Sequence, residues 1–233
     1  MEEGNLVKKT IFYCVLLLAL VVGSASNVFA RALQKDVDQA TTIIDRFRDM
    51  PEQGIPDAVL RQAKGLAIIT ALKAGFIFSG EGGSGVVVAR TAHGWSGPSA
   101  LGTGGAGFGF QAGAEVNEIV LVLNTPEAVN AFAHKANVKL GADLSVAAGP
   151  VGRNLAADVM PVAAVYTYSR SQGLYGGVSL EGAVIVTRND ANADYYGRPV
   201  SAAQILSGKV RPPAGSQKLR VALGSFRRDH PRS

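Results

Sequence analysis

The spacing of hydrophobic residues divides the chain into a helical first part and a strand-rich second part. Residues 33–50 carry apolar side chains at three- and four-residue steps, which places them on one face of a predicted helix: Leu33, Val37, Ala40, Ile44, Phe47 and Met50. A second, short helix is predicted over residues 56–65, with Pro56 in its first turn and Gly65 at its end.

From Gly65 onward the pattern changes to short runs of β-branched and aromatic residues separated by glycine. The runs "LAIITAL", "AGFIFSG", "SGVVVAR", "GFGFQAGAEV" and "EIVLVLN" predict strands joined by tight turns. Further strands are predicted within 138–149, 162–171 and 174–188, and short helices within 126–134, 191–197 and 201–208. N-terminal helices followed by closely spaced strands predict an α+β fold, with a mainly antiparallel, glycine-rich or barrel-like sheet and short helices.

The first 30 residues form a separate segment. Lys8 and Lys9 precede an uncharged apolar run, Ile11–Val22, and Val28 and Ala30 occupy the small-residue positions of a cleavage site. This pattern predicts a secretory signal peptide over residues 1–30, and the alternative is an uncleaved membrane anchor within residues 11–30. The protein is therefore expected to be exported, either periplasmic or associated with the cell envelope.

The cysteine count and the charge distribution refine this picture. Cys14, the only cysteine, lies in the predicted signal segment, and the chain has no glycosylation sequon, which fits a bacterial envelope. Residues 31–208 are nearly neutral, with 14 Lys/Arg and 15 Asp/Glu, whereas residues 209–233 carry seven Lys/Arg against Asp229. We therefore expect a single domain over 31–208 and a basic, flexible tail over 209–233.

One stretch has the form of a nucleotide-binding motif. "SGEGGSGVVVAR" contains Gly80-x-Gly82-x-x-Gly85, which matches both the dinucleotide fingerprint and the kinase glycine loop. Strand-forming valines follow it where the fingerprint needs a helix, and no kinase catalytic-loop motif is present. The same spacing recurs within 102–107, so high glycine content explains both matches. The predicted role of these glycines is to let the backbone bend or approach another strand closely.

The remaining chemistry does not indicate catalysis. The three histidines lack metal-ligand spacing, and no nucleophile, base and orienting group can be assembled, so neither an enzyme, a metal site nor a cofactor is predicted. The strand aromatics are interleaved with too few basic residues to predict nucleic-acid binding.

Several long blocks resemble the SYLF domain family. They are "IPDAVLRQAKGLAIITALKAGFIFSGEGGSGVVVAR", "WSGPSALGTGGAGFGFQAGAE", "LNTPEAVNAF", "LGADLSVAAGPVGRN" and "YSRSQGLYGGVSLEG", in the family's order from about Ile55 to Tyr196. The resemblance implies a lipid-binding domain, since eukaryotic members bind anionic phospholipids and fungal members also bind actin. The expected partner is an anionic phospholipid or membrane surface, and the alternative is a protein partner. Within the best-matching block, the residues predicted to contact lipid phosphate are Arg61, Lys64, Lys73 and Arg90.

Overall fold

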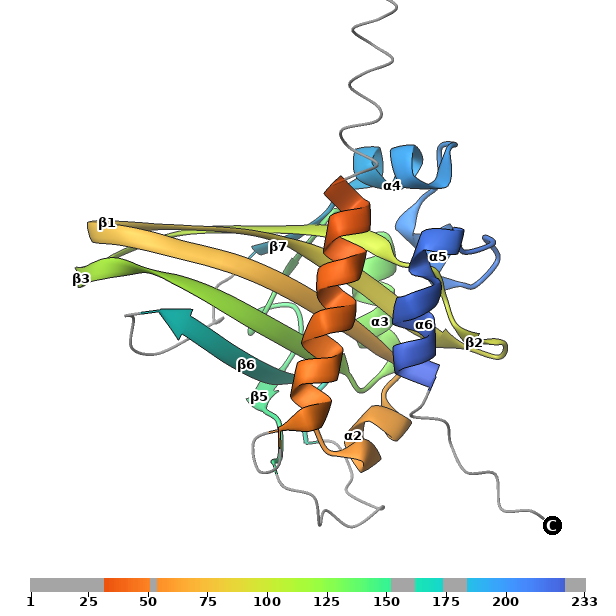
Figure 1. Ribbon diagram of the computed structural model, residues 1–233, viewed down its shortest axis with the longest axis horizontal. Helices are drawn as coiled ribbons and strands as arrows, with labels where there is room; N and C mark the ends of the chain where they lie inside the picture. The colour runs from red at the N-terminus through yellow and green to blue at the C-terminus, as the bar shows by residue number, and fades with distance from the viewer. Residues whose placement is uncertain (1–31, 51–53, 152–161, 174–183, 225–233) are drawn as a thin grey trace, which may run out of the picture.

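The computed structural model describes residues 32–50, 54–151, 162–173 and 184–224. Within them the chain forms a long helix and the short helix α2, then seven strands of one sheet with further short helices between and after the strands. The sheet is mainly antiparallel and curls into a half-barrel, so the predicted α+β class is confirmed. Figure 1 shows the N-terminal helix crossing one face of the sheet, with α6 beside it.

The N-terminal helix spans residues 32–49. The other helices are α2 (Asp57–Gln62), α3 (Pro126–His134), α4 (Asn189–Tyr196), α5 (Ala202–Leu206), the 3-10 helix η1 (Ala214–Ser216) and α6 (Gln217–Gly224). The strands are β1 (Gly65–Thr91), β2 (Gly94–Trp95), β3 (Ser99–Leu123), β4 (Asn137–Lys139), β5 (Val146–Ala148), β6 (Val165–Gly173) and β7 (Val184–Thr187).

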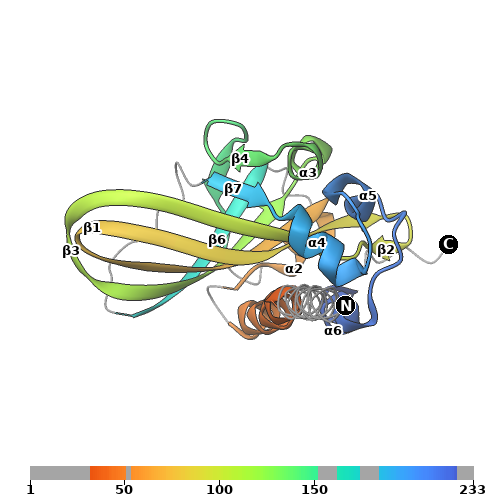
Figure 2. The same cartoon turned by 90° about the horizontal axis from the view of Figure 1, so that it is seen from above.

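Two long strands, β1 and β3, form a ribbon that organises the sheet. They pair antiparallel from Gly65 opposite Leu123 to Val87 opposite Ser99, with one register shift between Phe76 and Phe78. Figure 2 shows both strands bending back at the end farthest from the helices. The second half of β1 therefore returns beside the first, and the N–H of Arg90 donates to the carbonyl of Lys64 at 2.8 Å.

Each half of β3 takes a further strand on its free edge. β6 pairs with the C-terminal half of β3, and β7 pairs with its N-terminal half, while β5 and β4 extend the sheet beyond them. The prediction of separate short strands joined by tight turns over 66–90 and 108–124 is wrong. β1 runs for 27 residues and β3 for 25, and the register shift between Phe76 and Phe78 is the one irregularity in their pairing from Gly65 to Val87.

Two glycines of the 79–90 stretch, one of them in the motif, permit the close approach within β1. A Cβ atom built at Gly85 would lie 2.1 Å from the carbonyl oxygen of Ile68, and one at Gly83 would lie 2.5 Å from that of Thr70. A side chain at either position would collide with main-chain atoms of the first half of the strand. The expectation that glycine here serves backbone packing is confirmed at these two positions.

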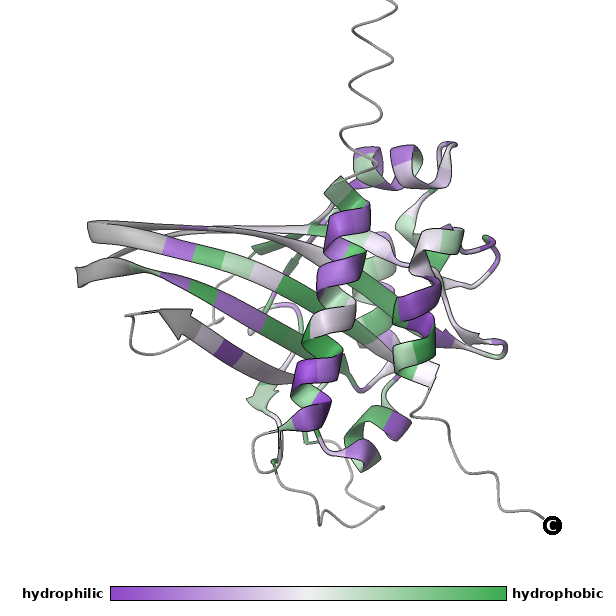
Figure 3. Cartoon of the chain, viewed as in Figure 1, coloured by the Kyte–Doolittle hydropathy of each residue, from purple (hydrophilic) through white to green (hydrophobic). Residues whose placement is uncertain are grey.

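Alternate residues of the ribbon face two separate cores. Even-numbered positions such as Leu66 and Ile68 pack with the N-terminal helix and α6, and odd-numbered positions such as Ala67 and Ile69 pack with α3. The helix buries its predicted apolar face in the first of these cores, and its Leu33 and Val37 are fully buried. Figure 3 shows hydrophilic residues recurring along the opposite, outward side of this helix.

The segment expected to be a flexible tail is folded as far as Gly224. Residues 214–224 form η1 and α6, and Leu219 and Leu223, spaced four residues apart, are fully buried beside the N-terminal helix. The prediction rested on the basic charge, the turn-forming residues within 211–217 and the polar end of the chain, but two leucines on one helix face bury enough apolar area to dock a basic segment. Residues 225–233 and the predicted signal segment 1–30 lie outside the described residues. No helix in the described part of the chain has the length and hydropathy that crossing a bilayer requires.

Candidate functional site

Three of the four predicted lipid-contacting residues gather at the end of α2. Arg61 lies in the last turn of this helix, Lys64 follows it, and Arg90 is joined to Lys64 through the main chain. Lys73 lies nine residues beyond Lys64 along β1, which corresponds to about 30 Å of extended strand. The structure therefore brings together Arg61, Lys64 and Arg90 and leaves Lys73 apart.

Arg90 stabilises the fold through all of its described contacts. Its Nε atom donates to the carbonyl of Ala63 at 3.0 Å, and one terminal nitrogen donates to that of Leu60 at 2.9 Å. The guanidinium lies 4.3 Å from the ring centroid of Trp95, which is the geometry of a cation–π contact. Arg90 thus satisfies carbonyls at the C-terminal end of α2, where helix carbonyls lack intrahelical partners.

Lys73 belongs to a different surface. It stands opposite Glu115 in the β1–β3 register, so both side chains lie on the α3-side face of the ribbon. Glu115 is only 1% exposed, which makes Lys73 the strand neighbour of a buried carboxylate. Lys73 is therefore placed beside a buried carboxylate of the sheet and away from Arg61 and Lys64.

A second buried carboxylate joins the N-terminal helix to the sheet. Glu118 is 2% exposed and lies on the helix-side face of β3. It forms ion pairs with Arg46 of the N-terminal helix and with Arg170 of β6, the latter at 3.4 Å. We call this cluster of Glu118, Arg46 and Arg170 the base ion cluster.

A groove opens on the distal side of the N-terminal helix, where the ribbon extends past it. We call it the helix–ribbon groove. It has a volume of about 580 Å³ and is lined by Ala32, Lys35, Asp36, Gln39, Thr70, Leu72, Gly82, Gly83, Ser84, Val116 and Arg188. Its floor contains the cross-strand pair Leu72 and Val116, which are 52% and 38% exposed. Among the ribbon residues whose side chains the structure describes, these two are the large apolar ones that are exposed.

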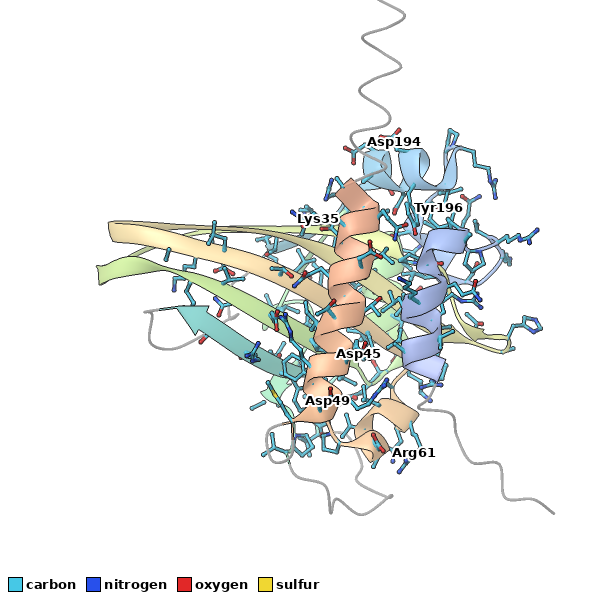
Figure 4. The ribbon with its side chains drawn as sticks, in the orientation of Figure 1. Lys35, Asp45, Asp49, Arg61, Asp194 and Tyr196 are labelled. Atoms are coloured by element: carbon cyan, nitrogen blue, oxygen red, sulfur yellow. The ribbon has the colours of Figure 1, made fainter. Side chains whose placement is uncertain are left out.

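The acidic group of the groove is engaged by its neighbours. Asp36 accepts a hydrogen bond from the Ser84 hydroxyl at 2.6 Å and pairs with Arg188 at 3.5 Å. Burial raises the pKa of Asp36 above its ordinary value, against the opposing effects of the Ser84 hydrogen bond and of the charges of Arg188 and Lys35. Lys35 is exposed, and no hydrogen bond or ion pair to its ammonium is found within the described residues. Figure 4 shows Lys35 beside the ribbon near the start of the N-terminal helix.

The third surface is cationic and lies at the C-terminal end of the described chain. Residues 198–224 contain no acidic residue and five basic ones: Arg198, Lys209, Arg211, Lys218 and Arg220. We call this segment the basic strip. Arg211 and Arg220 line a groove of about 510 Å³ with Pro212, Pro213, Ala214, Gln217 and Val221. Arg220 is held by a hydrogen bond from its Nε atom to the carbonyl of Trp95 at 3.2 Å.

The described residues contain no group of three or more His, Cys, Asp or Glu side chains placed to hold a metal ion. The end of α2, the helix–ribbon groove and the basic strip offer charged and apolar surface that is suited to binding a partner.

A family model matches residues 104–226, from within β3 through α6. Its family is Ysc84, described as Las17-binding protein actin regulator. The chain belongs to this family, the family of the SYLF domain.

The similarity to individual relatives covers most of this chain. LAS seventeen-binding protein 3 of Saccharomyces cerevisiae is 46% identical over 210 residues, which are 86% of this chain and 46% of that protein. SH3 domain-containing YSC84-like protein 1 of Homo sapiens is 43% identical over 209 residues, 86% of this chain and 61% of that protein. The chain thus spans about half the length of the curated relatives it matches.

Sequence reasoning missed the groove and the folded basic strip. The groove combines residues from positions 32–39, 70–72, 82–84, 116 and 188, which no local pattern connects. The sequence did contain a pattern that indicates the folded basic strip. The 27 consecutive residues of the strip include no acidic residue, and near their end two leucines lie four positions apart. A helical period after Pro212-Pro213 would have predicted α6.

Proposed function

We propose that this chain is a non-enzymatic binding module that recognises a protein partner. The observation that supports this most directly is the extent of the family match. Residues 104–226 include most of β3, then β6, β7 and helices α3 to α6, so a large part of the folded body is shared with the family to which relatives named for binding another protein belong. Partners of the actin-regulating kind are the class that these names favour.

The basic strip is the surface best suited to such a partner. Lys209, Arg211 and Lys218 are exposed, and the described residues supply none of their side chains with a hydrogen bond or ion pair. Unpaired cations on a folded helix and its preceding turn attract an acidic surface and fix its orientation.

Co-sedimentation of the full chain with actin filaments tests this proposal. We expect saturable sedimentation that weakens at least tenfold in the triple variant Lys209→Gln/Arg211→Gln/Lys218→Gln. The control variant Lys35→Gln/Arg61→Gln/Lys139→Gln removes the same charge elsewhere and should retain binding. Equal loss in both variants would reduce the interaction to net charge, and no sedimentation at any concentration would reject actin as the partner.

A second function, binding to an anionic membrane, is favoured by a separate observation. Arg61 and Lys64 lie at the end of α2 without a described side-chain partner, and Figure 4 shows Arg61 directed away from the body of the protein. Together with the basic strip they would supply about 1 kcal/mol per basic residue near an anionic surface. The predicted export of the chain agrees with a function at the cell envelope.

Sedimentation with vesicles separates this function from the first. The chain should bind vesicles containing phosphatidylglycerol at low salt and release them at high salt. It should not bind vesicles of pure phosphatidylcholine. A chain ending at Gly224 keeps α6 and tests whether residues 225–233 are needed. Binding that Arg61→Gln/Lys64→Gln leaves intact would exclude the α2 end, and binding to neutral vesicles would exclude an electrostatic mechanism.

A further inference from the structure

We propose that the helix–ribbon groove binds a single-chain anionic lipid, with the chain over Leu72 and Val116 and the acid group at Lys35. This inference rests on the proposed membrane function and deepens it. It names a lipid class and places it in a site distinct from the basic strip and the end of α2.

The floor of the groove is apolar surface that the fold leaves uncovered. On the same face of the ribbon, Leu66, Ile68, Val120 and Val122 are at most 1% exposed because the N-terminal helix lies over them. Leu72 and its cross-strand partner Val116 continue this face beyond the helix, and they are 52% and 38% exposed. An acyl chain lying there would extend the helix-side core with the same kind of contact.

The charges around the floor select an anionic head group. Asp36 is the acid among the lining residues, and it is already hydrogen-bonded to Ser84 and paired with Arg188. Lys35 remains as an exposed cation at the edge of the groove. An apolar floor with one available cation is complementary to a molecule with one chain and one negative charge.

Gly82 lines the groove, and no close packing contact requires a glycine at this position. A Cβ atom at Gly82 would have no heavy atom within 4 Å, so this position borders open space. Its neighbour Gly83, in contrast, lies against main-chain atoms of β1. Gly82 is thus a position at which a side chain could fill the groove while the fold is kept. The volume of about 580 Å³ lies within the range of small-molecule sites.

The probe is monomeric dodecanoate, below its micelle concentration and without vesicles, titrated into the full chain by calorimetry. We expect saturable binding at one site. The neutral ester glycerol monododecanoate should bind at least tenfold more weakly, because it lacks the charge that Lys35 recognises.

Three variants and two controls assign the site. Gly82→Leu should abolish binding by filling the groove, Leu72→Asn should weaken it about tenfold, and Lys35→Gln should weaken it two- to fivefold. Thr42→Leu adds an exposed leucine to the same helix outside the groove, and Lys64→Gln removes a cation elsewhere, so both should bind as the wild type does. Circular dichroism of each variant confirms that it is folded.

The outcomes separate this inference from the function on which it rests. Loss of dodecanoate binding in Gly82→Leu, with vesicle binding retained, would support the groove as a site of its own. Wild-type affinity in folded Gly82→Leu, or no saturable binding by the wild type, would overturn the inference even if vesicles bind. Saturable groove binding without any vesicle binding would uphold the site and reject the membrane function.

Discussion

The N-terminal helix contacts the β1–β3 ribbon at two places, each with a carboxylate. The two places differ in the burial and pairing of that carboxylate and in the exposure of the apolar residues around it. At the base, Glu118 is 2% exposed, is paired with Arg46 and Arg170, and lies among fully buried strand residues. At the distal end, Asp36 is held by Ser84 and more loosely by Arg188, beside the exposed Leu72 and Val116. The base is built for stability, whereas the distal end combines uncovered apolar surface with an available cation. Substitutions at the base should therefore change folding, and those at the distal end should change binding.

The largest expected effect comes from the close approach inside β1. Gly85→Val would place a side chain against the Ile68 carbonyl, and we expect a loss of about 3 kcal/mol or more of the free energy of unfolding, or failure to fold. Urea denaturation measures it. Gly82→Ala, three residues earlier in open space, should change stability by less than about 0.5 kcal/mol. Similar costs at both glycines would contradict the strand contact.

The base ion cluster should give the next largest effect. Arg46→Met leaves the buried carboxylate of Glu118 with Arg170 alone, and an incompletely paired buried charge costs about 1–3 kcal/mol. Lys35→Met, on the same helix at the distal end, should have no measurable effect on the midpoint of urea unfolding. A stable Arg46→Met variant would show that Arg170 and water compensate for the lost pair.

Arg90 provides a test of whether the predicted lipid site was misassigned. Arg90→Lys keeps the charge but loses the two-point contact with the Ala63 and Leu60 carbonyls, so we expect a stability loss of about 1–2 kcal/mol. Binding of the folded variant to anionic vesicles should be unchanged. Reduced vesicle affinity at unchanged stability would instead restore Arg90 to the lipid-contacting residues.

The sequence predicted those features that depend on local pattern. The helix period over 33–50 located the N-terminal helix within one residue, and Thr125 caps α3 as expected by accepting a hydrogen bond from the Ala128 N–H. The folding of β1 onto itself was beyond such reasoning, because Gly83 and Gly85 meet residues about fifteen positions earlier in the chain. For the same reason, the sequence could not separate the basic residues of the 55–90 block into those available for binding and those used by the fold. Arg61 is available, Arg90 is used by α2, and Lys73 faces a buried acid on the other side of the ribbon.

The smallest expected effect is the pH dependence contributed by Asp36 at the distal end. Burial raises its pKa in the folded protein above the value of 3.8 that an unfolded chain would have. Asp36 therefore favours folding most fully below pH 3.8, and this contribution is lost as pH rises through the folded-state pKa. Asn cannot ionise, so Asp36→Asn should gain stability relative to the wild type as pH rises across that window.

Urea unfolding of Asp36→Asn and the wild type at several pH values from 3.5 to 7 checks this direction, with Asp38→Asn, an exposed acid of the same helix, as the control. A difference that moves in the opposite direction, with the wild type gaining relative stability as pH rises, would mean that Arg188 and Ser84 outweigh burial. The contrast between the two ends of the helix would then rest on Leu72 and Val116 alone.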